Sequence, residues 1–373
     1  MELLYYSETG GIGGAENYLM WLANYFNASM DIAVCTPNNS KIELMIDFFK
    51  KKDIQCLRIN TKWYSSRIKL IVALFIVFLK NKPRLIHFSR IGTTSCLEAI
   101  IAATLLRIPF IVTEHFIPMN TVFSWKYKLY RYFLGKCAYK FIAPSQTPGR
   151  KLIDFHKVPE EKIEFIYNGV ELPRDFENTF NRERYCVELN IKENEVVFII
   201  VACLEPHKNQ MLAIQAFSKL LENNEIEAKL LIVGEGSIRR ELLEKIQELG
   251  LKEKCLLLGY REDVACLLKI SDVFILTSIE ENFSLAALEA GLMGLPLVLS
   301  HVGGLPEMIK QDETGYLFDP ENVSELVEYM SLLLNKSLRE KLGNAGKLRI
   351  SNLFSFDKMI LKTKKVYSEI LDR

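Results

Sequence analysis

Short runs of apolar residues alternate along the chain with longer stretches in which apolar positions recur at a helical spacing. Strands buried on both faces of a sheet form continuous apolar runs, and helices that cover a sheet have one apolar face. The alternation therefore predicts a mostly parallel sheet with helices on both faces. In the first half, the predicted strands are Leu3–Tyr6, Ile32–Cys35, Leu85–Phe88, Phe110–Thr113 and Phe141–Ala143, and the predicted helices include Ala15–Phe26 and Ile42–Lys51.

The same alternation restarts in the second half, after a polar and weakly patterned stretch from Leu172 to Glu195 that predicts a linker. The sequence thus predicts an α/β protein with two doubly wound, Rossmann-like domains, residues 1–172 and 173–353, and a ligand cleft between them. Residues 354–373 predict a terminal helix, Phe354–Leu371, which we expect to pack back on the first domain. The strands predicted in the second half are Val196–Val201, Lys229–Val233, Cys255–Leu258, Val273–Leu276 and Leu297–Leu299.

The composition is that of a soluble globular protein. The 373 residues suffice for roughly two domains, and the 49% hydrophobic and 25% charged residues are ordinary proportions. None of the eight cysteines belongs to a CxxC pair, so the spacing of a zinc ribbon is absent. The first residues do not follow the pattern of a signal peptide. We therefore expect a reducing, cytoplasmic setting.

Charge is distributed unevenly between the halves. Residues 1–170 carry 22 basic and 13 acidic side chains, whereas residues 171–373 carry 25 and 33. The longest apolar run, Ile68–Leu79, has 12 residues and is broken only by Lys69, against about 20 residues needed to span a bilayer. The segment Trp125–Phe133 interleaves bases with aromatic residues. These features predict peripheral contact with the anionic inner face of the cell membrane. The alternative is that the two halves differ in composition without any membrane contact, and that the run Ile68–Leu79 is a helix packed on a sheet.

A glycine-rich loop, Gly10–Glu16, follows the first predicted strand. Its four glycines let the backbone approach a ligand closely, and the helix that begins near Ala15 offers free N–H groups to an anion. The spacing matches neither the dinucleotide fingerprint nor the P-loop. By itself the loop is equally well explained as a tight turn.

Two glutamates, Glu281 and Glu289, follow the predicted strand Val273–Leu276 and are separated by seven residues. Glu281 falls in a loop, and Glu289 falls one to two turns inside the next helix. The start of that helix, near Phe283–Leu285, offers N–H groups to a phosphate. Carboxylates beside an anion site suit the binding of sugar hydroxyls. The alternative is an ordinary helix start, where acidic residues are favoured.

These motifs occur in an order that resembles the glycosyltransferases of family 4, which have the two-domain GT-B fold. The resemblance spans nearly the whole chain. No single motif is decisive, but the full set of motifs in this order is highly specific for the family. It implies that the second domain binds a nucleotide sugar and that the first binds the acceptor. The matching motifs are Gly13–Glu16, Thr113–His115, Ala143–Ser145, Asn168–Val170, Leu204–Asn209, Val233–Gly236, the pair Glu281 and Glu289, and Gly303-Gly304 with Pro306-Glu307.

The resemblance also implies a role for each matching residue. Lys208 would neutralise the diphosphate as the sugar leaves, which stabilises the transition state more than the ground state. Glu281 would contact the donor sugar, Glu289 the ribose, and His115 the sugar from the first domain. The implied catalytic residues are thus His115, Lys208 and Glu281; the plain alternatives are a structural histidine and a solvated lysine. The implied donor-binding residues are Gly13, Gly14, Cys203, Lys208, Gly234, Gly236, Tyr260, Asn282, Phe283, Ser284, Leu285 and Glu289.

Cys203 departs from the family pattern, which places an arginine five residues before the lysine. A cysteine cannot supply the fork of charged donors that an arginine gives. The loss of one such contact costs on the order of 2–4 kcal/mol of transition-state stabilisation. Asn282, where the family prefers glycine, is a smaller departure.

The resemblance implies a hexosyl transfer with retention of anomeric configuration, and UDP is the commonest donor nucleotide of the family. Retaining hydrolases use a carboxylate nucleophile, for which the sequence offers no convincing candidate. A front-face substitution assisted by the departing phosphate is therefore implied. No DxD motif or metal-ligand cluster occurs in the sequence, which predicts catalysis without a metal or other cofactor. The expected acceptor is a glycan or lipid-linked glycan of a bacterial surface polysaccharide, such as capsule or lipopolysaccharide.

Other functions share this architecture. A nucleotide-sugar epimerase of the GT-B type stays open, and Cys203 leaves open a catalytically impaired protein that binds the donor. A phosphorylase of this type would be longer and would carry a lysine-bound pyridoxal phosphate. Nucleic-acid binding is disfavoured, because the net charge of the whole chain is only +1.

Overall fold

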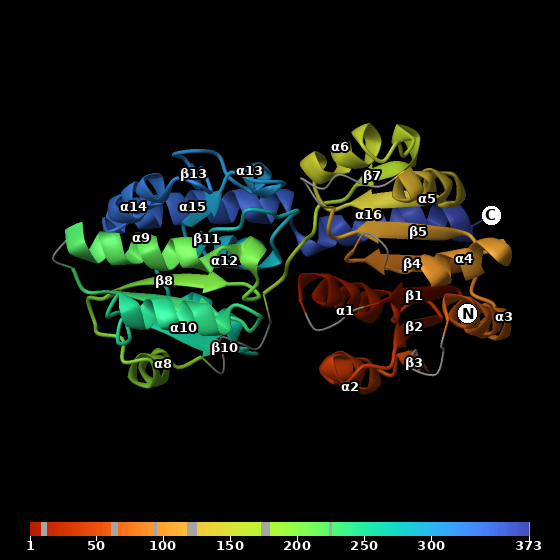
Figure 1. Ribbon diagram of the computed structural model, residues 1–373, viewed down its shortest axis with the longest axis horizontal. Coiled ribbons are helices and arrows are strands. Elements are labelled where there is room, and N and C mark those ends of the chain that lie inside the picture. Colours follow the sequence, from red (N-terminus) through yellow and green to blue (C-terminus); the bar gives the residue numbers. More distant parts are fainter. Residues whose placement is uncertain are drawn as a thin grey trace. The chain divides into compact units, whose positions relative to one another are not determined.

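The computed structural model describes residues 1–8, 13–60, 66–92, 95–117, 125–172, 180–223 and 226–372. It divides into two compact units. Unit 1 comprises Met1–Asn168 and Asp357–Arg373, and unit 2 comprises Gly169–Phe356. Each unit is a parallel sheet with helices on both faces (Figure 1). The predicted fold class, two doubly wound α/β domains, is confirmed.

Unit 1 contains a seven-stranded sheet in the order β3-β2-β1-β4-β5-β6-β7, and every neighbouring pair is parallel. The order reverses at β1 and β4, which is where doubly wound sheets bind ligands. The strands are β1 (Leu3–Ser7), β2 (Ile32–Pro37), β3 (Gln55–Ile59), β4 (Leu85–Arg90), β5 (Phe110–Glu114), β6 (Lys140–Ala143) and β7 (Ile163–Phe165).

Helices cover both faces of this sheet because successive strand side chains point to opposite sides. On one face, Tyr6 packs with Phe78 of α3 and Leu134 of α5 in a single apolar core. On the other, the buried Tyr5 approaches Tyr367 of α16. The helices are α1 (Gly14–Phe26), α2 (Glu43–Lys51), α3 (Arg67–Asn81), α4 (Leu97–Leu105), α5 (Trp125–Cys137), α6 (Gln146–Asp154) and α16 (Phe356–Leu371), with 3-10 turns η1 (Ser40–Ile42) and η3 (Glu160–Lys162).

Unit 2 contains a six-stranded parallel sheet in the order β10-β9-β8-β11-β12-β13. Its strands are β8 (Val196–Val201), β9 (Ala228–Val233), β10 (Cys255–Gly259), β11 (Val273–Leu276), β12 (Leu297–Ser300) and β13 (Gly315–Phe318). Its helices are α8 (Arg182–Glu188), α9 (Gln210–Asn223), α10 (Arg239–Glu248), α11 (Val264–Ile270), α12 (Leu285–Leu292), α13 (Leu305–Met308), α14 (Val323–Leu332) and α15 (Lys336–Leu353), with the 3-10 turn η4 (Pro206–Lys208).

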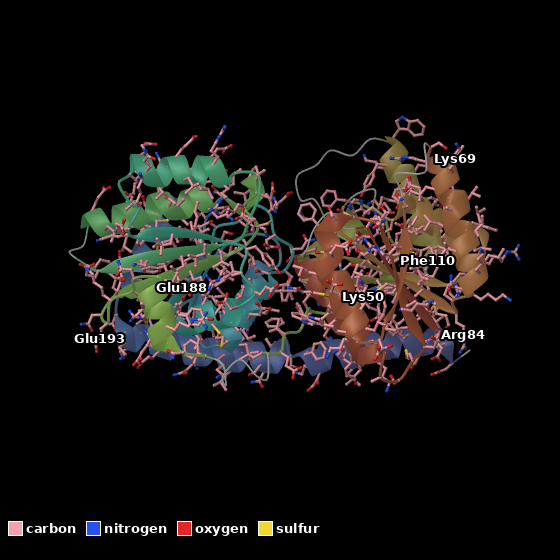
Figure 2. All side chains as sticks on the ribbon, turned by 90° about the horizontal axis from the view of Figure 1, so that it is seen from below. Lys50, Lys69, Arg84, Phe110, Glu188 and Glu193 are labelled. Carbon is pink, nitrogen blue, oxygen red and sulfur yellow. The ribbon has the colours of Figure 1, made fainter. Side chains whose placement is uncertain are left out.

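The secondary structure differs from the prediction in several places. The stretch predicted as a linker contains helix α8, whose Glu188 is labelled in Figure 2. Strand β13, which opens at Gly315, was not among the predicted strands. The predicted terminal helix Phe354–Leu371 corresponds to α16, which begins two residues later, at Phe356, after a break that follows the end of α15 at Leu353. Phe354 at the break is buried and packs edge-on against Phe283, with 5.3 Å between ring centroids.

No helix within the described ranges is long and apolar enough to cross a bilayer.

Candidate active site

The donor-binding residues expected in unit 2 follow four strands of its sheet. Cys203 and Lys208 follow β8, Gly234 and Gly236 follow β9, and Tyr260 follows β10. The segment 281–285 follows β11. Because the strands are parallel, these segments lie at one edge of the sheet, where doubly wound proteins bind ligands.

Lys208 and Glu281 form an ion pair at this edge. The Lys208 Nζ atom lies 2.5 Å from the Glu281 Oε2 atom, and the side chains are 15% and 12% exposed. Burial disfavours the charge of the lysine, but the adjacent carboxylate outweighs it and raises the pKa of Lys208 above its ordinary value. Lys208 is therefore fully charged at neutral pH, with Glu281 as its partner.

The backbone fixes the loops that carry this pair. The Ile279 N–H donates to the His207 carbonyl oxygen at 2.8 Å, and the Thr277 hydroxyl donates to the Asn209 carbonyl oxygen at 2.8 Å. Gly303, with φ of +55°, presses against Glu281: a Cβ at Gly303 would lie 1.6 Å from the Glu281 carbonyl oxygen. No other residue type fits at Gly303 without displacing the Glu281 loop.

The glycines after β9 allow a close approach to the Cys203 loop. A Cβ at Gly234 would lie 1.9 Å from the Ala202 carbonyl oxygen, and a Cβ at Gly236 would lie 2.2 Å from the Leu204 carbonyl oxygen. The Leu204 N–H donates to the Glu235 carbonyl oxygen at 2.9 Å. The structure thus brings Gly234, Gly236 and Cys203 together.

Cys203 brings no positive charge to this place. Burial raises the pKa of its thiol, against the smaller opposing effect of Lys208, so the thiol is neutral at pH 7. Its carbonyl oxygen accepts a hydrogen bond of 2.8 Å from the Gln210 side-chain amide.

Glu289 lies on the second turn of α12. Its side chain is partly buried, and within the described part of the chain no hydrogen bond reaches its carboxylate. Burial raises the pKa of Glu289 to about 7. A carboxylate kept from solvent without a protein partner suits a ligand that brings its own hydroxyl groups.

The start of α12 is built from the other residues expected there. The Ser284 hydroxyl caps the helix by accepting from the Ala287 N–H at 3.2 Å. Asn282, Phe283 and Leu285 are all buried, so these positions shape the loop through packing. Tyr260, in contrast, is 53% exposed, as suits a residue expected to flank the base.

In unit 1, His115 directly follows β5. The backbone N–H of His115 donates to the Arg90 carbonyl oxygen at 2.9 Å. The imidazole ring packs edge-on against the Tyr18 ring, with 4.8 Å between the ring centroids. Burial lowers the pKa of His115 to about 4, against the opposing effect of Glu114. The imidazole is therefore neutral at pH 7. It can act as a hydrogen-bonding group but not as a cation.

Beside His115 lies a buried charge cluster that sequence reasoning missed. The Arg90 and Arg131 Nη1 atoms lie 2.9 and 2.5 Å from the same Glu114 Oε1 atom, and all three side chains are at most 3% exposed. Burial acts to raise the pKa of Glu114, but the two guanidinium groups reverse this and lower it. Arg131 falls in the segment read as a membrane contact, yet it points into the core.

A second buried network ties α16 to the same edge. The His87 Nδ1 atom lies 2.6 Å from the Tyr367 hydroxyl, and Nε2 lies 2.7 Å from the Thr113 hydroxyl. Tyr367 donates onward to the Tyr5 hydroxyl at 3.2 Å. The geometry fits an imidazole with its proton on Nδ1. Thr113 also lies 3.5 Å from the hydroxyl of Tyr18, the residue that packs on His115.

Of the glycine loop, only its end lies within the described ranges. The Gly13 N–H donates to the Glu16 Oε2 atom at 2.8 Å, and α1 begins at Gly14. Residues 10–12, also part of the predicted loop, lie outside the described residues.

Two family models match the chain in succession. The model described as Glycosyltransferase Family 4 matches residues 12–174, and the model described as Glycosyl transferases group 1 matches residues 181–349. The chain belongs to the family 4 glycosyltransferases. The resemblance inferred from its motifs is thereby confirmed.

Individual relatives match over different shares of their length. The N-acetyl-alpha-D-glucosaminyl L-malate synthase of Bacillus anthracis is 29% identical over 57% of this chain, and the match spans 55% of that relative. The UDP-Gal:alpha-D-GlcNAc-diphosphoundecaprenol alpha-1,3-galactosyltransferase of Escherichia coli is 29% identical over 82% of this chain and 80% of that protein. A Campylobacter jejuni alpha-1,4-N-acetyl-D-galactosaminyltransferase named for a PP-undecaprenol substrate is 26% identical over 94% and 93%.

Solved structures share the fold along the whole chain. A glycosyltransferase from Rickettsia africae has a TM-score of 0.82 at 22% identity, covering 100% of this chain and 99% of that one. HepE from Anabaena, solved in complex with UDP and glucose, has a TM-score of 0.83 at 20% identity, covering 99% and 100%. The family 4 chain described here therefore has the GT-B fold.

Proposed function

We propose that this protein transfers a hexosyl group from a UDP-sugar to a glycan or lipid-linked glycan acceptor, with retention of anomeric configuration. The observation that carries the proposal is the juxtaposition, at the ligand-binding edge of unit 2, of the charged Lys208 with the carboxylate of Glu281. The UDP bound to HepE and the UDP-Gal in the name of the Escherichia coli relative support UDP as the nucleotide.

In this reaction Lys208 compensates the charge that grows on the diphosphate as the bond from the anomeric carbon to the phosphate oxygen breaks. The start of α12 adds the partial positive charge of a helix N-terminus. A bond forms between the same carbon and an acceptor hydroxyl, whose proton passes to the departing phosphate oxygen. Glu289 accepts hydrogen bonds from the ribose hydroxyls. The roles assigned to Lys208, to the start of α12 and to Glu289 require no metal ion.

Retention without a protein nucleophile follows from the role that the family resemblance gives to Glu281. Retaining hydrolases place a carboxylate nucleophile against the anomeric carbon, whereas Glu281 would bind the hydroxyl groups of the donor sugar. We therefore assign Glu281 to the hydroxyls of the sugar and the substitution to the front face. The neutral His115 of unit 1 serves as a further hydrogen-bonding group for the sugar.

A transfer assay tests this function. The protein is incubated with UDP-galactose, UDP-glucose or UDP-N-acetylglucosamine and with α-D-GlcNAc-diphosphoundecaprenol in detergent micelles. We expect UDP release coupled to a heavier lipid product with one of these donors, and an α linkage by NMR. Release of a free isomerised sugar without an acceptor would instead indicate an epimerase. Lys208→Met should abolish product formation.

A catalytically impaired donor-binding protein is the second candidate, because the thiol of Cys203 brings no charge to the position where the family has arginine. The variant Cys203→Arg separates the two. If the wild type transfers sugar at a measurable rate and Cys203→Arg transfers it faster, the protein is a slow transferase. If neither the wild type nor Cys203→Arg transfers sugar, although both bind the nucleotide, the protein is a catalytically impaired donor-binding protein.

We further propose that unit 1 meets the cytoplasmic face of an anionic membrane, where a lipid-linked acceptor resides. Helices α3 and α5 contain no acidic residue and several exposed bases, including Lys69 near the start of α3 (Figure 2) and Lys128. Both helices pack their inner side chains on the same face of the sheet. Their exposed apolar residues are Ile68, Val72, Ile76, Leu79, Trp125, Leu129, Tyr132 and Phe133.

Sedimentation with vesicles tests the membrane proposal. We expect the wild type to sediment with phosphatidylglycerol vesicles, less so at high salt, and not with phosphatidylcholine vesicles. Val72→Asp with Ile76→Asp should abolish the binding. The matched control is Leu332→Asp with Leu348→Asp, which changes two exposed apolar residues of unit 2. Equal sedimentation of the α3 variant and the control would refute the proposal.

A further inference from the structure

Lys208 and Glu281 neutralise each other. The contact is short, 2.5 Å, and both side chains are mostly buried. A donor diphosphate therefore does not meet a waiting cation. It has to replace the carboxylate as the partner of Lys208, and Glu281 then needs a new partner of its own.

The loops leave Glu281 little freedom to escape into solvent. A backbone hydrogen bond from Ile279 to His207 joins the Glu281 loop to the Lys208 loop. The Thr277 hydroxyl also donates to backbone carbonyl oxygens of the Lys208 loop. Gly303 presses on the Glu281 carbonyl from the other side. When a diphosphate takes Lys208, the Glu281 carboxylate stays nearby, partly buried and next to negative charge.

Two ligands then differ in what they offer. A nucleoside diphosphate takes Lys208 and leaves Glu281 without compensation, which is costly for a mostly buried carboxylate. A nucleotide sugar brings hydroxyl groups that donate to Glu281 in place of the lysine. We propose that the Lys208–Glu281 pair is a specificity-determining device that makes the site prefer the nucleotide sugar over the free nucleoside diphosphate.

This inference rests on the proposed function, since it requires the donor to bind at the edge of unit 2. Glu281 acts against the free nucleotide and therefore favours release of the product UDP after transfer. Removal of the Glu281 charge should strengthen the binding of UDP. It should also reduce the preference of the site for the UDP-sugar over UDP.

Isothermal titration of the full-length protein with UDP and with UDP-galactose, UDP-glucose and UDP-N-acetylglucosamine tests the device. We expect Glu281→Gln to bind UDP about tenfold more tightly than the wild type, equivalent to about 1.4 kcal/mol, because Lys208 is no longer occupied. The ratio of UDP-sugar affinity to UDP affinity should fall at least tenfold. Lys208→Met should weaken both ligands.

The matched control is Glu280→Gln, which removes a charge from the same loop and keeps the Lys208–Glu281 pair. It should change UDP affinity less than threefold. If Glu281→Gln binds UDP no more tightly than Glu280→Gln does, the inference is wrong while the proposed function stands. If the wild type binds none of these nucleotides, the proposed function fails and the inference fails with it.

Discussion

Glu289→Gln should stabilise the protein at pH 8 and leave its stability nearly unchanged at pH 4.5. Burial raises the pKa of this carboxyl from 4.5 to about 7 in the folded chain. Between these values the folded state holds a proton that the unfolded state has lost, so the free energy of unfolding falls as the pH rises through this window. At 1.36 kcal/mol per pKa unit, the loss above pH 7 is about 3 kcal/mol.

Glutamine is never ionised, so the variant avoids this loss. Urea unfolding at pH 8 and at pH 4.5 measures the difference, and the melting temperature of the variant should lie above that of the wild type at pH 8. The control Glu253→Gln removes an exposed glutamate of the same unit and should have no such pH-dependent effect. Equal stability changes at the two pH values would show that Glu289 ionises in the fold without cost.

The same substitution should damage donor binding. A glutamine side chain has one acceptor oxygen and cannot match a carboxylate that accepts from two ribose hydroxyls. We expect UDP affinity to fall about tenfold, measured by titration, while the folded protein becomes more stable at pH 8. A residue that destabilises the empty protein and strengthens ligand binding belongs to a functional site rather than to the core.

Three further predictions concern the loops and the buried cluster. Cys203→Arg should raise kcat by about two orders of magnitude, by analogy with the effect of one charged or oxyanion-type contact; an unchanged kcat in an active enzyme shows that other groups already supply this charge. Gly303→Ala should lower the unfolding temperature and the affinity for UDP-sugar together, because a Cβ collides with the Glu281 carbonyl; a variant with normal binding contradicts the packing argument. Glu114→Gln should cost about 3–5 kcal/mol in urea unfolding at pH 7, because it leaves Arg90 buried without its carboxylate. Since the pKa of Glu114 is lowered in the fold, this difference should shrink as the pH falls below its usual range.

Buried central strands could be predicted from the sequence, whereas three of the four edge strands, β3, β7 and β13, could not. The strands β8 and β11 are continuous apolar runs because helices cover both of their faces. The edge strand β3 carries exposed polar residues, and β13 opens on a glycine, so neither shows that signal. Helix α8 was missed because only Tyr185 of its seven residues is buried.

The site could be predicted as positions but not as contacts. Motif order placed Lys208 and Glu281 at the ends of two strands, but their pairing depends on β8 and β11 lying side by side in parallel register. The cluster of Arg90, Glu114 and Arg131 left no trace in the sequence. A run of bases and aromatic residues predicts an exposed surface, and only the packed helix α5 shows that Arg131 turns inward.

The most direct test of the account is thermal melting of the wild type with UDP, GDP, ADP and their common sugars, repeated with Lys208→Met and Glu289→Gln. A ligand at about 100 times its Kd adds roughly 2.7 kcal/mol to the free energy of unfolding. The account predicts a clear rise in melting temperature with UDP-sugars that Lys208→Met abolishes and Glu289→Gln reduces. No rise with any nucleotide, or a rise that both variants retain in full, would contradict the assignment of the donor to this edge of unit 2.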